Sequence, residues 1–120
     1  MKTEFEFLVR LIQSNSLDIR LTAIGAIAKT KQNNSLVIEI LSHVIKFNSE
    51  PEKNAAIQAL GEIGGRDAIN ILMNEIQTPT TNSIKKLAIN ALGEAMKNTE
   101  LNELAENLAD HKQELRLRVM

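Results

Sequence analysis

The chain of 120 residues is 43% hydrophobic and 24% charged, which are the length and the apolar content of one folded domain. Its 14 basic and 15 acidic residues are interspersed and give a formal net charge of -1, so nucleic acid is disfavoured as a ligand because no broad positive surface is expected. Cysteine is absent, which excludes disulfides, thiolate metal sites and cysteine nucleophiles.

The amino-terminal segment carries acids at Glu4 and Glu6, where a signal peptide needs a basic region followed by an apolar one. No uninterrupted apolar run approaches the length of a membrane span. We therefore expect a cytoplasmic protein without a membrane partner.

Apolar residues recur every three or four positions from the start of the chain, which predicts amphipathic helices. The first helix is expected over residues 4–13 and the second over 17–30, with a turn of serine and asparagine between them. A third follows the polar segment 31–35, and its apolar stripe runs from Val37 to Ile45.

Proline suits the first turn of a helix, so Pro51 places the start of a fourth helix, with Ser49 or Glu50 as its cap. The glycines at 64–65 end this helix, because glycine readily takes the left-handed conformation that closes one. Asp67 is expected to cap a fifth helix.

The remainder of the chain predicts three more helices. They cover residues 84–97, the apolar stripe of 101–108, and the start of an eighth helix at 110–120. No segment alternates cleanly between apolar and polar residues, so the expected fold class is all-α.

One phrase organises the chain: residues 53–64 read Lys-Asn-Ala-Ala-Ile-Gln-Ala-Leu-Gly-Glu-Ile-Gly, and related phrases occur at 20–28 and 85–96. Aligning them places Ala23, Ala56 and Ala88 in one column, 33 and then 32 positions apart. The second helices are aligned as Val37 with Ile69 and Leu101, Leu41 with Met73 and Ala105, and Val44 with Ile76 and Leu108. Each unit is thus a helical hairpin, and residues 1–120 form one repeat domain that starts and stops mid-unit. We expect either a piece of a longer array or association through its carboxyl-terminal edge.

The phrase closely resembles the short HEAT-like repeats of the type first named from phycobilisome lyases. The resemblance implies an α-solenoid of helical hairpins, with about three full repeats and a partial repeat at each end. The ankyrin phrase Thr-Pro-Leu-His and the tetratricopeptide Trp and Tyr positions are absent. Repeats of this class include lyase subunits, scaffolds and hydroxylases, so the resemblance alone does not assign a function.

Glycine within a helix costs roughly 1 kcal/mol relative to alanine. Gly61 and Gly93 occupy one column, so both are expected where a neighbouring helix comes too close for a larger side chain. On this basis Gly93→Leu should overpack and destabilise strongly, whereas Asn90→Leu should be mild.

No residues form a catalytic or cofactor-binding motif, and His43 and His111 form neither a His-Glu nor a His-x-x-x-His pair, so we expect no metal site. The acids and bases near the helix starts, among them Arg20 and Glu52, are interpreted as caps and salt bridges between repeats. The leading hypothesis is therefore a noncatalytic protein-interaction module or scaffold.

In repeats of this class the outward face of the second helices lines the concave side. That face is polar and mildly acidic here, which suits hydrogen bonding to a protein segment and favours a basic one. The expected partner-binding residues are Glu39, Ser42, His43, Asn70, Asn74, Glu75, Asn102, Glu103, Glu106 and Asn107. The resemblance leaves open a component of a bilin or phycobiliprotein lyase-like factor, and nucleic-acid binding is a third, weaker hypothesis.

Overall fold

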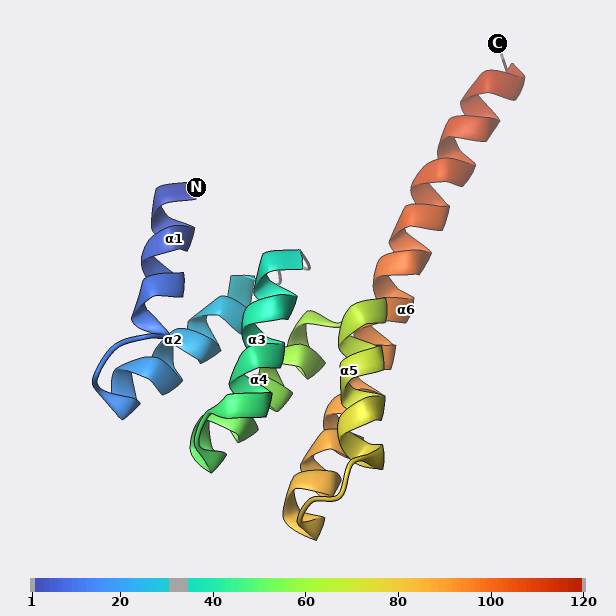
Figure 1. The fold of residues 1–120 in the computed structure, drawn as a ribbon. Helices are drawn as coiled ribbons and strands as arrows, with labels where there is room; N and C mark the ends of the chain where they lie inside the picture. The colour runs from blue at the N-terminus through green and yellow to red at the C-terminus, as the bar shows by residue number, and fades with distance from the viewer. Residues whose placement is uncertain (1, 31–34, 120) are drawn as a thin grey trace.

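The computed structural model describes the backbone of residues 2–30 and 35–119 and the side chains of residues 4–30 and 35–100. The described backbone is all-helical and contains six helices and no strand (Figure 1). The helices are α1 (Lys2–Leu11), α2 (Leu17–Thr30), α3 (Ser35–Phe47), α4 (Glu50–Ile63), α5 (Arg66–Gln77) and α6 (Asn82–Val119). The predicted fold class is confirmed.

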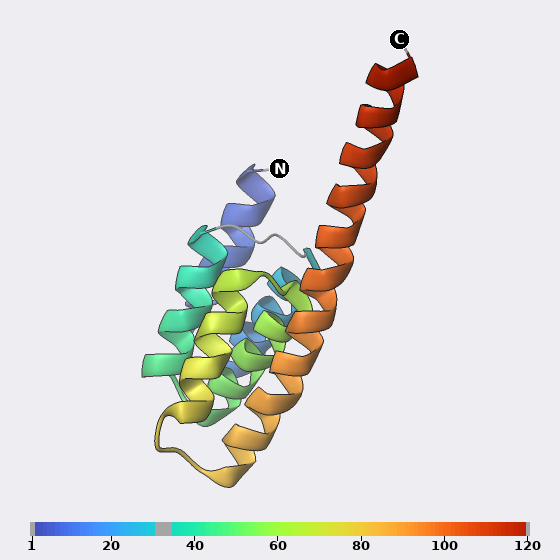
Figure 2. The ribbon, with the colours of Figure 1, turned by 90° about the vertical axis from the view of Figure 1, so that its right-hand side faces the viewer.

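The helices lie in two rows. In one row α4 packs between α2 and the first part of α6; in the other, α3 contacts α5. The rows join because α1 packs on α2, α3 on α4, and α5 on both α4 and α6, as Figure 2 shows for the later helices. This arrangement is compatible with a helical-repeat solenoid.

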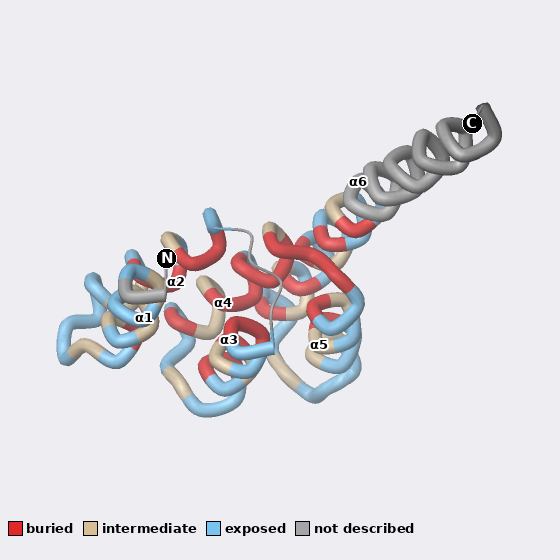
Figure 3. Tube along the Cα trace, turned by 90° about the horizontal axis from the view of Figure 1, so that it is seen from above, coloured by how far each residue is buried: buried red, intermediate tan, exposed pale blue. Residues whose placement is uncertain are grey.

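The core is almost entirely aliphatic. Figure 3 shows buried residues where α2, α3 and α4 face one another, and exposed residues along the outer sides of α1, α3 and α5. The largest fully buried side chains are Ile24, Ile27, Val37, Leu41, Ile57, Leu60 and Leu72. Over the residues searched, no helix has both the length and the apolar character needed to cross a membrane.

The ends of α4 form as the sequence predicts. Pro51 lies in the first turn after the cap residue Ser49, and the chain leaves the helix through Gly64 and Gly65, whose φ angles are 70° and 95°. The fifth helix differs slightly, because Gly65 precedes it and Asp67 lies inside its first turn instead of capping it.

The last three predicted helices are one continuous helix, α6, so the expected breaks near residues 98 and 109 are wrong. Met96 and Lys97 occupy the alignment positions of Gly64 and Gly65, and both are good helix formers. Positions 96 and 97 therefore lack the pair of glycines that ends α4. As a result α6 continues and extends beyond the neighbouring helices (Figures 1 and 2).

Side chains just beyond this point tie α6 to the end of α4. The Asn98 amide donates to the carbonyl oxygens of Gly61 and Glu62 at 2.9 and 3.1 Å. The buried Gly65 N–H donates to Thr99 Oγ1 at 2.8 Å. These bonds satisfy backbone groups that the end of a helix leaves without partners. Residues that align with the first turn of α5 thus bind the end of α4.

The repeated glycines have different environments. A Cβ added at Gly61 would lie 3.1 Å from the carbonyl oxygen of Ala91 and 3.2 Å from its Cα and Cβ, so Gly61 is confirmed as a spacer at a close helix approach. A Cβ added at Gly93 would meet nothing within 4 Å, because no helix covers that side of α6 among the described residues. The expectation that Gly93→Leu overpacks is therefore wrong.

Burial also corrects the alignment of the second helices by one residue. Leu41 is fully buried, but its predicted partner Met73 is 44% exposed, whereas Leu72 is fully buried. The link between α2 and α3 spans residues 31–34, while α4 and α5 are separated by two glycines. The shorter link moves α5 relative to α3, so Leu41 corresponds to Leu72 and Val37 to the buried Ala68.

Candidate functional site

Two grooves lie along the row of second helices, and both are lined by residues that the sequence assigned to a partner-binding face. The α3–α5 groove has a volume of about 530 Å³, and the α1–α3 groove about 620 Å³. The α3–α5 groove is lined by Ser42, Ile45, Lys46, Lys53, Asn70, Ile71, Asn74, Glu75, Thr78, Pro79 and Thr80. The α1–α3 groove is lined by Ile12, Gln13, Ser14, Asn15, Arg20, Glu39, Ile40, His43, Val44 and Asn48.

The α3–α5 groove combines an apolar base with exposed amides. Ile45 is buried and Ile71 half-buried, so they supply its apolar part. Asn70 and Asn74 are exposed and four residues apart on α5, which places them on one side of the helix. Among the described residues, neither amide side chain has a hydrogen-bond partner, so both are free to bind a ligand.

A salt bridge links this groove to the other row of helices. Lys53 Nζ on α4 lies 3.7 Å from Glu75 Oε1 on α5, with side chains 24% and 12% exposed. The partial burial of both groups reduces their screening by solvent, so the pair contributes to the packing of α5 on α4. Glu75 therefore serves a structural contact within the groove.

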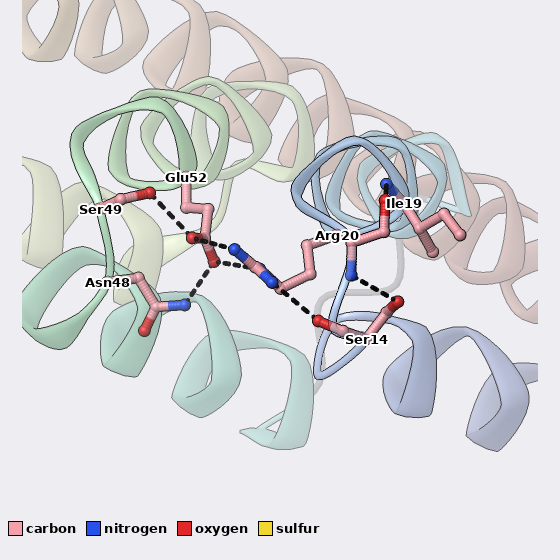
Figure 4. A network of polar contacts seen from close by, with 7 residues as sticks. Ser14, Ile19, Arg20, Asn48, Ser49 and Glu52 are labelled. Atoms are coloured by element: carbon pink, nitrogen blue, oxygen red, sulfur yellow. Dashed lines mark hydrogen bonds and ion pairs between the residues drawn. The ribbon is translucent and has the colours of Figure 1, made fainter.

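At the edge of the α1–α3 groove, Arg20 binds both carboxylate oxygens of Glu52 through the Nε and Nη2 edge of its guanidinium (Figure 4). The Nη2–Oε1 and Nε–Oε2 distances are both 3.2 Å, and Arg20 Nη1 also donates to the carbonyl oxygen of Ser14 at 2.8 Å. Asn48 Nδ2 donates to Glu52 Oε2 at 2.6 Å, and the Ser49 hydroxyl donates to Oε1 at 2.8 Å. The interpretation of Arg20 and Glu52 as a salt bridge between repeats is confirmed.

Glu52 is 3% exposed, so its charge depends on these partners. Burial by itself raises the pKa of the Glu52 carboxyl, but hydrogen bonds from Asn48, Ser49 and Arg20, together with the charge of Arg20, outweigh burial and lower the pKa below its ordinary value. Glu52 thus remains ionised near neutral pH. A carboxylate held in this state by three donors stabilises the fold and is poorly suited to proton transfer.

The two grooves are equivalent positions of the repeat. With the corrected alignment, His43 in the α1–α3 groove corresponds to Asn74 in the α3–α5 groove. Arg20 and Lys53 belong to one column and each lines one groove. The repeat therefore builds the same recess twice with a basic residue in each, and varies the side chains around it.

The expected partner-binding residues are divided between these grooves. Ser42, Asn70, Asn74 and Glu75 lie together in the α3–α5 groove, whereas Glu39 and His43 lie in the α1–α3 groove. The side chains of Asn102, Glu103, Glu106 and Asn107 lie outside the described residues, and their predicted separate helix is part of α6.

Sequence reasoning missed the basic character of the α3–α5 groove. Lys46 and Lys53 line it with Glu75 as the one acid, so the predicted mild acidity does not hold for this groove. The repeated basic column at positions 20, 53 and 85 was the available signal for Lys53. Lys46 had no equivalent signal, because its position becomes important only when α5 packs beside α3.

The described side chains contain no group of three or more histidines, aspartates or glutamates placed to hold a metal ion. No protein-family model matches the chain, and no curated protein is a significant match.

Proposed function

We propose that this protein is a noncatalytic interaction module of the HEAT-like repeat type, and that it holds an extended segment of a partner protein in the α3–α5 groove. The observation that carries the proposal is the pair of exposed amides, Asn70 and Asn74, above an apolar base. The resemblance of the repeated phrase to HEAT-like repeats supports the same conclusion.

The spacing of the amides suits an extended backbone. Residues four apart on a helix present side chains about 6 Å apart, and groups on the same side of an extended chain recur every two residues, or about 6.6 Å. An asparagine side chain offers both a donor and an acceptor, so each amide can pair with the backbone of one residue of the segment. Ile45 and Ile71 would contact its apolar side chains.

The charge of the groove favours an acidic segment over a basic one. The salt bridge with Glu75 neutralises Lys53, while Lys46 is exposed at the same groove. An acidic residue of the bound segment would gain from this lysine, whereas a basic residue would be repelled. This reverses the partner charge expected from sequence.

The test begins with random linear peptides displayed on phage and selected on the immobilised protein. The affinities of the selected peptides are then measured by fluorescence anisotropy. The double variant Asn70→Ala, Asn74→Ala should weaken binding about tenfold to hundredfold, because two hydrogen bonds of about 1 kcal/mol each are lost.

Gln77→Ala is the matched control, since it removes an exposed amide from the same helix but outside the groove lining. It should leave the affinity unchanged. If every selected peptide binds the double variant as tightly as the original protein, the groove is not the binding site and the proposal fails.

A further inference from the structure

Large apolar side chains are exposed mainly at the two ends of the helix rows. Eight such residues are exposed among the described side chains, and six of them lie on the first and last helices of the two rows. At one end they are Phe7 on α1 and Leu17 and Ile19 on α2, and at the other end Met73 on α5 and Ile89 and Met96 on α6. Each end therefore exposes three large apolar side chains.

The exposed face of α6 repeats a surface that is covered elsewhere in the chain. We call it the forward face, defined by Ile89, Gly93 and Met96. Ile89 is 53% exposed, but the residues of its column, Ile24 and Ile57, are both 0% exposed. The difference arises because α4 covers α2 and α6 covers α4, whereas no described helix covers α6 on this side.

Gly93 makes the comparison specific. Its counterpart Gly61 allows Ala91 of the next helix to approach so closely that a Cβ would lie 3.1 to 3.2 Å from Ala91 atoms. Gly93 lies in the same column, and no atom in the described part of the chain is within 4 Å of the position of an added Cβ. The chain thus carries a helix-weakening glycine whose space is unused within one copy.

The opposite end carries the complementary surface. We call it the back face of α2, defined by Ile19, Thr22 and Ala26. Ile84, in the column of Ile19, is 5% exposed, but Ile19 is 45% exposed. Ala26 is half-buried and occupies the column of Ala91, the residue that contacts Gly61.

We propose that copies of this chain associate head to tail, with the back face of α2 of one copy docked on the forward face of α6 of another. The contact continues the interface already formed between α4 and α6. Ala26 of the second copy takes the place of Ala91 against Gly93, and Ile19 becomes covered as Ile84 is.

The row that contains α1, α3 and α5 also exposes apolar side chains that a second copy of the chain would cover. Met73 on α5 is 44% exposed and corresponds, in the corrected alignment, to Ser42 in the α3–α5 groove. Phe7 on α1 is 57% exposed and lies beside Glu6 and Arg10 on the outer side of α1. Head-to-tail docking brings α1 of the second copy beside α5 of the first, so Phe7 would cover Met73 as the first row closes.

This contact uses two different surfaces, so it is heterologous and produces open chains of increasing length. The wild-type protein should therefore show an average mass that rises continuously with concentration in sedimentation equilibrium. Gly93→Arg blocks the forward face and Ile19→Arg blocks the back face, and each variant should remain monomeric. Both positions are exposed in one copy, so folding should be retained and is checked by circular dichroism.

Mixing the two blocked variants is the decisive step. Each retains one intact face, so an equimolar mixture should form dimers and nothing larger. Gly25→Arg and Asn90→Arg are controls from one exposed column of α2 and α6, and both should associate like wild type. Gly93→Ala should weaken association at least about tenfold while the fold becomes more stable, which a folding defect would not produce.

A wild-type protein that stays monomeric at its highest soluble concentration would overturn the proposal. So would association that Gly93→Arg abolishes and Ile19→Arg leaves intact, since that result would mean a symmetric contact between two α6 helices. Failure of the mixture to dimerise would also refute it. None of these outcomes bears on peptide binding in the α3–α5 groove.

Discussion

Alanine at Gly61 and alanine at Gly93 should change stability in opposite directions. Alanine is favoured over glycine in a helix by about 1 kcal/mol, and this gain applies to both sites. At Gly93 no atom of the described residues lies within 4 Å of the new Cβ, so Gly93→Ala should stabilise one copy of the chain by about 0.5 to 1 kcal/mol.

At Gly61 the same gain is opposed by overpacking. The new Cβ would lie 3.1 Å from the Ala91 carbonyl oxygen and 3.2 Å from its Cα, and these backbone atoms cannot rotate away. Forcing an extra methyl group into a well-packed contact costs about 1 to 3 kcal/mol. Gly61→Ala should therefore be neutral or destabilising by up to about 2 kcal/mol, and the two variants should differ by about 1 to 3 kcal/mol.

Urea denaturation followed by far-ultraviolet circular dichroism measures this difference. Protein concentration is kept low enough that sedimentation shows one species, so association does not contribute to stability. Effects on the unfolded chain are similar for the two glycines and cancel in the comparison. If both variants shift the midpoint by the same amount and sign, the close approach of α6 to Gly61 does not exist.

Three further changes test the contacts that hold the helices together. Glu52→Gln should lower the free energy of unfolding by about 3 kcal/mol, because the guanidinium of Arg20 loses its counter-charge. The pKa of Glu52 is lower in the folded protein than in the unfolded chain, so the unfolded chain binds a proton at this carboxylate at a higher pH. The stability that the ionised carboxylate gives to the wild type is therefore complete above the ordinary pKa of 4.5 and is lost as the pH falls through the pKa of the folded state. The thermal midpoints of wild type and Glu52→Gln should accordingly converge in acid. Thr99→Val removes the acceptor of the buried Gly65 N–H and should cost about 1 to 3 kcal/mol in urea denaturation, whereas Thr99→Ser should cost less. Replacing both Met96 and Lys97 by glycine should lower the helical circular dichroism signal, because about 2 kcal/mol of helix propensity is lost where α6 passes the end of α4; an unchanged signal would show that those two residues do not keep α6 continuous.

Helix positions were predictable where the local sequence contains both a period and a stop. Residues 17–30 form α2 as expected, and Gly64 and Gly65 end α4 with positive φ angles. The basic column was also visible, and salt bridges between repeats were expected from it, although the acceptor of Lys53 was not identified. Arg20 and Lys53 could be placed near helix starts, but their acceptors, Glu52 and Glu75, lie on other helices.

The candidate site was predictable only in part for the same reason. Asn70 and Asn74 share a helix side because of their spacing, so they could be grouped from sequence. Their groove exists because α3 and α5 pack side by side, and that contact adds Lys46 to the lining. A shift of one residue in α5, caused by the shorter link before it, changed which side chains are neighbours.

The sequence by itself determined that this protein is all-helical and that it carries one phrase three times, because apolar periodicity and helix-ending glycines are local properties. The tertiary structure alone decided which copies of a repeated residue are covered. Gly61 and Gly93 occupy the same position of the phrase, yet a Cβ added at Gly61 would meet Ala91, whereas one added at Gly93 would meet no atom of the described residues within 4 Å. Likewise α6 continues through the expected turn. Met96 and Lys97 stand there in place of a glycine pair, and Asn98 binds the end of α4. Burial depends on a neighbouring helix, and a repeated pattern specifies a surface without specifying whether that neighbour is present.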